Sequence, residues 1–165
     1  MDLTESIQAR SDQINADDLV TGPMTYTIRE VIGGKAESPF DFMLVETDRA
    51  YRPSKTMRRV IVAGWGPKAE AYAGRRLTIY REPSIKFGGQ TVGGIRISAM
   101  SHLEKHVEVM LQTSRGKREK FVVEPLPELT NAERIASLRA EWQTADPERR
   151  AAIEAESKAL QDGAQ

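Results

Sequence analysis

The chain has 165 residues and contains no cysteine, which excludes disulfides, thiolate metal sites and cysteine nucleophiles. Histidine is also scarce, with His102 and His106 as its two copies, so a histidine-rich metal centre is not expected. No run of 18 apolar residues is present, which argues against a transmembrane helix and a membrane partner. Residues 1–5 are acidic and lack the apolar core of a secretory signal, so we expect a cytoplasmic protein.

Neither sign of charge dominates the whole chain, because 24 lysines and arginines balance 24 aspartates and glutamates. The balance hides an asymmetry, since residues 49–120 carry 16 basic and five acidic side chains, a net charge of +11. Residues 1–48 and 121–165 carry the compensating charges of −7 and −4. This segregation predicts a polyanion-binding face between acidic flanks, although charges scattered around a barrel would give the same count.

The N-terminal part of the pattern predicts an arm followed by a β-rich domain. Residues 1–20 are polar with little periodicity and are expected to form a flexible acidic arm. A turn signal at 21–23 opens a domain that extends to residue 127. Strands are predicted from period-two alternation or β-branched runs at 24–32, 40–47, 57–65, 76–81 and, in two short segments, 85–97.

Helix signals are found at two places in the sequence. The alanine-rich stretch 66–74, with Pro67 near its start and Gly74 at its end, predicts one or two helical turns.

The C-terminal part of the sequence predicts a β-hairpin over residues 106–124, followed by a helical tail over 128–165. In the tail, one helix begins near Thr130 and a second at Asp146, and their thin apolar faces favour weak docking or a partner.

The predicted order of elements is typical of a mainly β fold. Five short, glycine-punctuated strands with a helix between the third and fourth match a five-stranded oligonucleotide-binding (OB) barrel. The β-hairpin and the C-terminal helical tail would be additions to this barrel. An SH3-like barrel or another small mixed β fold is the alternative.

Two stretches carry a resemblance to a known family. The first contains Trp65-Gly66, then Ala69-Glu70 and Gly74, then Phe87-Gly88-Gly89 and a short strand that ends at Ser98 and Ser101. It resembles the OB domains of replication protein A and related single-stranded-DNA-binding proteins. Residues 86–89 and 93–97 also look like small OB-type proteins of tailed phages. This resemblance spans about residues 21–101 and implies single-stranded-DNA binding, in the host cytoplasm if the chain is phage-encoded.

Single-strand binding needs cations along the sugar–phosphate backbone and aromatic rings on which bases stack. The loop 49–59 supplies both and borders the expected binding face of the barrel. We expect bases to stack on Tyr51 and Phe87. The candidate nucleic-acid-binding residues are Arg49, Tyr51, Arg52, Lys55, Arg58, Arg59, Arg81, Lys86, Phe87, Arg96, Arg115, Lys117 and Arg118.

Other residues in this region leave alternatives open. Trp65 is either a core residue or a ligand contact, with the core favoured, while Tyr26 and Phe42 are expected to face the interior. The glycines at 88–89 and 93–94 are either turn residues or allow a ligand to approach the backbone closely.

The sequence gives little support for catalysis, so we expect no catalytic residues, no metal and no cofactor. His102 and His106 lie four residues apart, but no third ligand is apparent, and no Gly-Lys-Ser/Thr follows the glycines. The expected function is therefore non-enzymatic single-stranded-DNA binding in replication or recombination. The alternative is a protein-interaction module or inhibitor whose helical tail docks on a replication, recombination or host factor. A homo-oligomer is compatible with either.

Overall fold

The computed structural model describes residues 12–91 and 93–163, without the side chains of residues 87, 113 and 114. The chain divides into one unit that ends at Leu126 and a second that begins at Pro127. None of the described helices has the length and the apolar character that a membrane-spanning helix requires.

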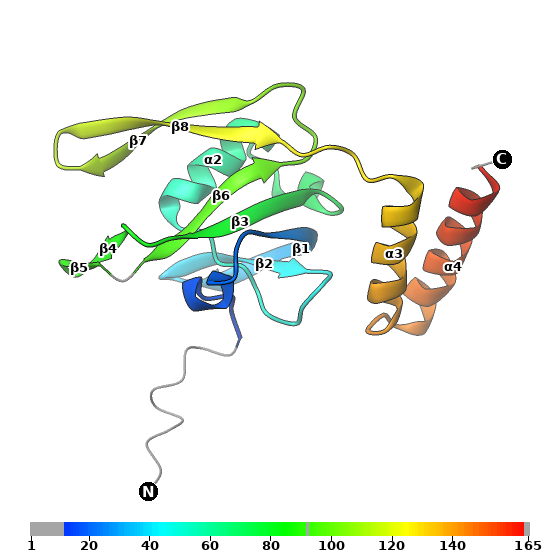
Figure 1. The fold of residues 1–165 in the computed structure, drawn as a ribbon. Helices are drawn as coiled ribbons and strands as arrows, with labels where there is room; N and C mark the ends of the chain where they lie inside the picture. The colour runs from blue at the N-terminus through cyan, green and yellow to red at the C-terminus, as the bar shows by residue number, and fades with distance from the viewer. Residues whose placement is uncertain (1–11, 92, 164–165) are drawn as a thin grey trace, which may run out of the picture. The chain divides into compact units, whose positions relative to one another are not determined.

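The scaffold of the first unit is a six-stranded mixed sheet with the order β2-β1-β3-β6-β8-β7 (Figure 1). All neighbouring strands are antiparallel except β6 and β8, which run parallel. Two further short strands form a separate hairpin, β4–β5. The strands are β1 (Met24–Lys35), β2 (Ser38–Leu44), β3 (Arg76–Glu82), β4 (Lys86–Phe87), β5 (Gln90–Thr91), β6 (Gly94–Met100), β7 (Val107–Ser114) and β8 (Lys117–Pro125).

Strand β1 is twelve residues long and pairs with two different strands. Its first part, Met24 to Thr27, pairs with β3, and the part from Ile28 to Lys35 pairs with β2. A register shift between Ile28 and Glu30 separates the two ladders, as expected where a long strand bends between partners. Tyr26 on this strand and Phe42 on β2 are buried, so the prediction that both face the interior is confirmed.

Two segments outside the named strands continue the sheet beyond β2. Tyr51 forms an antiparallel bridge with Phe42, and Ala50 forms a parallel bridge with Gln13. A short 3-10 helix, η1 (Ala16–Leu19), follows and packs against β3 with Leu19 buried. Residues 12–20 are therefore packed into the unit, which corrects the expectation of a flexible arm there, and residues 1–11 lie outside the description.

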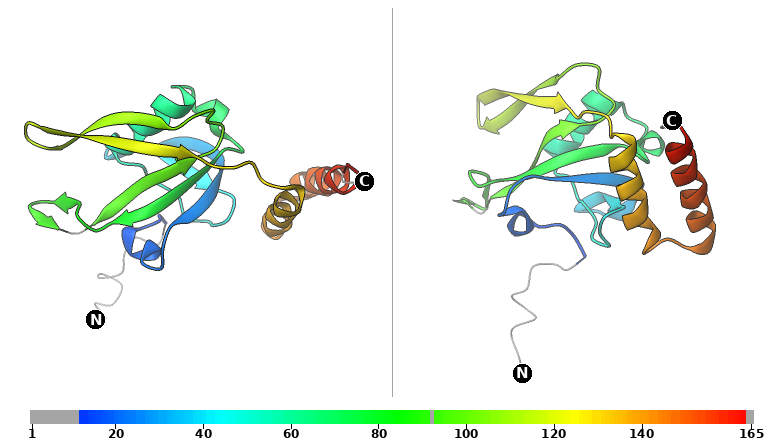
Figure 2. Two further views of the ribbon diagram at one scale, coloured as in Figure 1. Left: turned by 45° about the horizontal axis from the view of Figure 1, so that its top comes forward. Right: turned by 45° about the vertical axis from the view of Figure 1, so that its right-hand side comes forward.

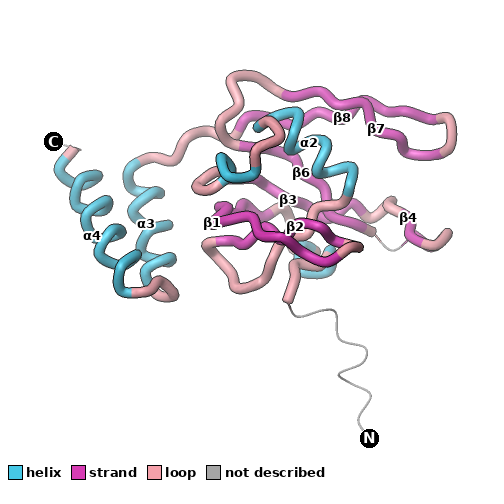
Figure 3. Tube along the Cα trace, turned by 180° about the vertical axis from the view of Figure 1, so that it is seen from behind, coloured by secondary structure: helices cyan, strands magenta, loops and turns pink. Residues whose placement is uncertain are grey.

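The largest difference from the sequence prediction is at residues 55–65. The expected strand at 57–65 is the helix α2 (Lys55–Trp65), which begins where the Ser54 hydroxyl accepts a hydrogen bond from the Met57 amide. The run of β-branched residues at 60–62 favoured a strand, but the helical period places Met57, Val60, Ile61 and Trp65 on one buried face. Figure 3 shows α2 over one face of the sheet.

The helix predicted at 66–74 is a single 3-10 turn, η2 (Ala69–Tyr72). Because residues 57–65 are helical, they do not form the expected third strand, and the chain between β2 and α2 has isolated bridges at Ala50 and Tyr51 instead. The fold is mainly β, and β2 and β7 stand at opposite ends of an open sheet in the described residues.

Trp65 belongs to the core of this unit. Its indole Nε1 donates a hydrogen bond to the backbone oxygen of Ser101 at 2.7 Å, and its ring lies 5.3 Å from that of Tyr72. The guanidinium of Arg75 covers the ring at 5.6 Å. The prediction that favoured the core for Trp65 over a ligand contact is confirmed.

The second unit consists of two helices, as the sequence predicts. They are α3 (Asn131–Trp142) and α4 (Pro147–Asp162), and Figure 2 shows them side by side. Thr130 caps α3 in a capping box with Glu133, and Asp146 caps α4. Ion pairs join the helices, from Arg134 to Glu156 at 2.7 Å and from Arg149 to Glu141 at 2.6 Å.

Candidate functional site

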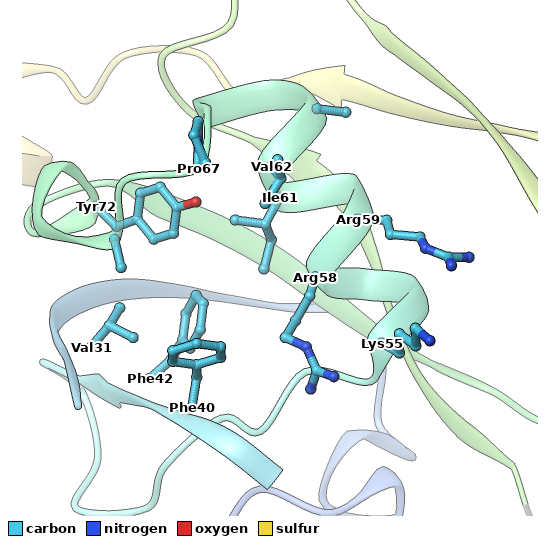
Figure 4. Close-up of a pocket in the computed structure, with 12 residues that line it drawn as sticks. Val31, Phe40, Phe42, Lys55, Arg58, Arg59, Ile61, Val62, Pro67 and Tyr72 are labelled. Atoms are coloured by element: carbon cyan, nitrogen blue, oxygen red, sulfur yellow. The ribbon is translucent and has the colours of Figure 1, made fainter. Parts of the chain in front are cut away.

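A pocket of about 600 Å³ lies between α2 and the hairpin formed by β1 and β2 (Figure 4). This volume is within the range of small-ligand sites. Its floor is apolar, and three cations of α2 stand along one side. The lining residues are Val31, Phe40, Phe42, Lys55, Arg58, Arg59, Ile61, Val62, Ala63, Pro67, Ala69 and Tyr72. We call these three cations, Lys55, Arg58 and Arg59, the α2 cations.

The periodicity of each element explains why these side chains meet. Phe40 and Phe42 are two residues apart on β2 and therefore point to the same side of the sheet. Val31 lies opposite Phe42 in the β1–β2 ladder. On α2, Arg58 and Val62 are four residues apart and share a face, so the helix presents a cation and an apolar side chain together.

The two phenylalanines of the pocket differ in exposure. Phe42 is buried, with its ring 6.1 Å from Tyr72, and forms part of the floor. Phe40 is 45 % exposed at the edge of the pocket, although large apolar side chains usually lose their contact with water on folding. Its ring is therefore accessible to a ligand.

The α2 cations carry charge that no described carboxylate neutralises. In the described residues, none of the three has a carboxylate within ion-pair distance. Arg58 donates one hydrogen bond to the backbone oxygen of Pro53 at 3.0 Å, and this bond leaves its charge uncompensated. The pocket thus combines apolar and aromatic surface with a positive rim.

Four of the sequence-predicted cations are held in ion pairs instead. Arg49 pairs with Asp18 at 3.0 Å, and Arg81 lies 3.8 Å from Asp17. Arg52 pairs with Asp41 and with Asp12, and Lys117 pairs with Glu119 at 3.1 Å. The acidic residues at positions 12–18 therefore neutralise three arginines of the basic segment.

Tyr51 does not provide a stacking surface. Its side chain is 1 % exposed and packs edge-on against Phe42 at 6.2 Å, so the expectation that bases stack on Tyr51 is wrong for this structure. Its hydroxyl has no hydrogen-bond partner in the described part of the chain. Burial raises the pKa of Tyr51. Tyr51 is a core residue, and its backbone bridge to Phe42 continues the sheet beside β2.

The other predicted residues lie outside the pocket. Lys86, Arg115 and Arg118 have no ion pair with any described residue. The guanidinium of Arg96 stacks on Phe121 at 5.6 Å. Burial raises the pKa of Tyr80, and the positive charge of Arg96 partly opposes this shift. The side chain of Phe87 lies outside the described part of the structure, so stacking on it stays a prediction.

Segments that are distant in the sequence gather at one end of the unit. Figures 1 and 3 agree that the β4–β5 hairpin, the tip of the β7–β8 hairpin and the start of α2 point to this end. These segments carry Lys86, Arg115, Arg118 and the α2 cations. The fold therefore places part of the basic segment at one end of the unit.

The glycines at 88–89 and the two histidines lie in turns or beside polar side chains. Gly88 and Gly89 have φ angles of 60° and 81° in the turn between β4 and β5, a left-handed backbone that glycine adopts readily. His102 lies beside the Ser101 hydroxyl at 2.7 Å, whereas His106 faces Glu108 at 3.3 Å. Within the described residues, no three histidine, aspartate or glutamate side chains cluster as metal ligands would.

Sequence reasoning missed Phe40 and the apolar floor of the pocket. The spacing of Lys55, Arg58, Arg59 and Val62 indicates one helical face, but only if residues 55–65 are assigned as a helix. No protein-family model, curated protein or solved structure matches this chain. Chemically, the site suits a ligand that joins anionic groups to flat or apolar ones.

Proposed function

We propose that the first unit binds single-stranded nucleic acid at this pocket, without catalysing a reaction on it. The observation that carries the proposal is the position of Phe40. Its exposed ring shares one pocket with three cations that have no carboxylate partner among the described residues. Single-strand binding requires this pairing of cations with an accessible aromatic ring.

Each part of the site has a role in the proposal. The α2 cations contact phosphates, and an unstacked base lies against Phe40 over the apolar floor. Lys86, Arg115 and Arg118 extend the electrostatic contact to the hairpins at the same end. A base within a duplex is already stacked and paired, so it cannot enter the pocket without unpairing. The site therefore favours single strands, such as those exposed during replication or recombination.

We further infer that the first unit is an OB-type fold with a reduced third strand. The long β1 pairs with the strand that follows it and with the strand that follows the helix, and the helix precedes an antiparallel pair, β3 and β6. The antiparallel bridge between Tyr51 and Phe42 stands where a third strand would begin. This connectivity supports the OB resemblance of the sequence.

The test is fluorescence anisotropy with a labelled single strand of about 30 nucleotides, long enough for several site sizes of an OB domain. A duplex of the same sequence competes, and salt is varied. The variant K55E/R58E/R59E is compared with K105E/R139E/K158E, which reverses three exposed cations elsewhere that have no ion pair among the described residues.

We expect tight, salt-sensitive binding that prefers the single strand. The first variant should bind far more weakly, and its salt slope should fall by about 2, because each lost phosphate contact removes ~0.7 from the slope for single strands. The control variant should stay close to the parent. Equal losses in both variants, or no preference for the single strand, would contradict the proposal.

A second proposal, protein docking by the helices α3 and α4, is favoured by one observation. Trp142 at the end of α3 remains partly exposed, with the Arg150 guanidinium stacked on its ring at 4.4 Å. Tryptophan and arginine are enriched at binding hot spots. In this case Trp142→Ala would weaken capture of a replication, recombination or host factor without changing DNA affinity, and such capture would depend little on salt. Unchanged capture by the variant would contradict docking at Trp142.

A further inference from the structure

The two edges of the six-stranded sheet differ in how the chain covers them. At the β2 edge, residues 50–51 and 12–14 continue the hydrogen bonding, with Phe42 and Tyr51 exchanging both backbone bonds at 2.9 Å. At the opposite edge, β7 pairs with β8 alone. In the described part of the chain, no other segment forms a backbone hydrogen bond to β7. The outward N–H and C=O groups of β7 therefore have no backbone partner among the described residues and are available to a further strand.

The composition of β7 does not protect this edge. Natural edge strands are usually blunted by lysine, proline, short length or a bulge. Strand β7 has eight residues, contains neither lysine nor proline, and is in regular register up to Gln112. Its one acidic residue, Glu108, forms an ion pair at 2.6 Å with Lys120 of β8. Met110, at the middle of the regular part, is 60 % exposed.

We propose that β7 pairs antiparallel with β7 of a second copy of this chain, around a two-fold axis at Met110. A two-fold axis perpendicular to the sheet preserves its two faces, so residues opposite each other must have the same orientation. This condition requires one residue to lie opposite its own copy, with the axis between the two. The pairing joins two six-stranded sheets into one and covers the exposed Met110 side chains with each other.

The choice of Met110 as the centre follows from the side chains. This register places Val109 opposite Leu111 on the core-facing side of the strand. It places Glu108 opposite the neutral amide of Gln112, so no like charges face each other. A centre at Val109 would instead place Glu108 opposite Met110 and leave the carboxylate against an apolar side chain.

The absence of cysteine in the chain allows a direct test of this register. Directly opposed residues in antiparallel strands have Cα atoms about 4.5–5.5 Å apart, which suits a disulfide. In the full-length protein, Met110→Cys should therefore form a disulfide-linked dimer under mild oxidation. Met24→Cys, at an exposed methionine of β1, is the matched control and should form no disulfide cross-link under the same oxidation.

Two further variants distinguish the register from random collision. Glu108→Cys alone should link slowly, because residues 108 of the two copies would lie about 14 Å apart along the strands. A mixture of Glu108→Cys and Gln112→Cys chains should link rapidly and form only mixed dimers. Rapid linking of Glu108→Cys chains to Met110→Cys chains would overturn the Met110 register in favour of Val109.

Sedimentation velocity measures the association without any cross-link. The parent chain should sediment increasingly as a dimer as its concentration rises, and Met110→Lys should remain monomeric, because it places two positive charges at the axis. Far-ultraviolet circular dichroism of Met110→Lys should match that of the parent, since the side chain is exposed. A parent chain that stays monomeric at every concentration, with Met110→Cys linking no faster than Met24→Cys, would overturn the proposal. The outcome does not depend on nucleic-acid binding.

Discussion

Arg52 holds Asp41 through two parallel hydrogen bonds, from Nε to Oδ1 at 2.8 Å and from Nη2 to Oδ2 at 3.0 Å. The same guanidinium also binds Asp12 and the side-chain oxygen of Gln13, each at 2.9 Å. Its bond to Asp41 is the main cause that raises the pKa of Arg52. One arginine therefore fastens residues 12–13 and the segment before α2 to strand β2.

This arrangement predicts a structural rather than a ligand-binding role for Arg52. Arg52→Gln should lower the free energy of unfolding by about 2 kcal/mol, the scale of hydrogen bonds to charged groups. Urea denaturation measures this change. Arg118→Gln, at an exposed cation without an ion pair among the described residues, should leave stability unchanged and serves as the control. An Arg52→Gln variant of normal stability but weaker DNA affinity would show that Arg52 contacts the ligand instead.

The buried hydroxyl of Tyr51 leads to a prediction about stability and pH. Because this hydroxyl lacks a described partner, Tyr51→Phe should raise the free energy of unfolding at pH 7 by about 1 kcal/mol. Burial raises the pKa of Tyr51 in the folded state above its value of about 10 in the unfolded chain. Below pH ~10 the hydroxyl is therefore neutral in both states, and the stability of the folded state does not depend on its ionisation. Stability is then lost as the pH rises above that value, because the unfolded state ionises first.

Urea unfolding at a series of pH values from neutral to alkaline measures the effect. Tyr51→Phe should lose less stability than the parent above pH ~10. Tyr80→Phe is a useful comparison, because burial raises the pKa of Tyr80 as well, though its side chain is only partly buried. A Tyr51→Phe variant that is clearly destabilised at pH 7 would mean that the hydroxyl has a partner in solution.

Phe40 is predicted to be the stacking residue of the proposed interface. Phe40→Ala should weaken single-strand binding about 10-fold, since base–aromatic stacking contributes ~1–3 kcal/mol per base. The salt slope should not change, because no phosphate contact is lost. Ile32→Ala removes a similarly exposed side chain, 42 % against 45 %, that does not line the pocket. Equal affinities of the two variants, measured by anisotropy, would exclude stacking on Phe40.

Trp65 and Trp142 are expected to respond differently to the same substitution. Trp65→Phe removes the donor to the Ser101 backbone oxygen and should cost about 1–3 kcal/mol of unfolding free energy. Trp142→Phe changes a partly exposed ring and should stay within about 0.5 kcal/mol. Thermal unfolding followed by circular dichroism measures both. A larger loss from Trp142→Phe than from Trp65→Phe would mean that the partly exposed indole contributes more to stability than the buried one.

The strands and the two C-terminal helices were predictable because their local signals agree. Strand β1 alternates, β7 and β8 flank a glycine turn, and Thr130 and Asp146 cap the helices. At residues 57–65 the signals conflict, since β-branched residues favour a strand while the apolar spacing fits a helix. The helix buries Met57, Val60 and Ile61 in the core, and this tertiary packing outweighs the strand propensity of the β-branched residues.

For the candidate site, the amino-acid sequence is enough to show that cations are concentrated in residues 49–120 and that cysteine chemistry is absent. Which of those cations form ion pairs depends on the packed structure. Arg52 and Lys55 are three residues apart, yet Arg52 is held by Asp12 and Asp41, while Lys55 borders the pocket. The reason is physical: ion pairing depends on distances between side chains from remote segments, and these distances exist only after the sheet and α2 have packed together.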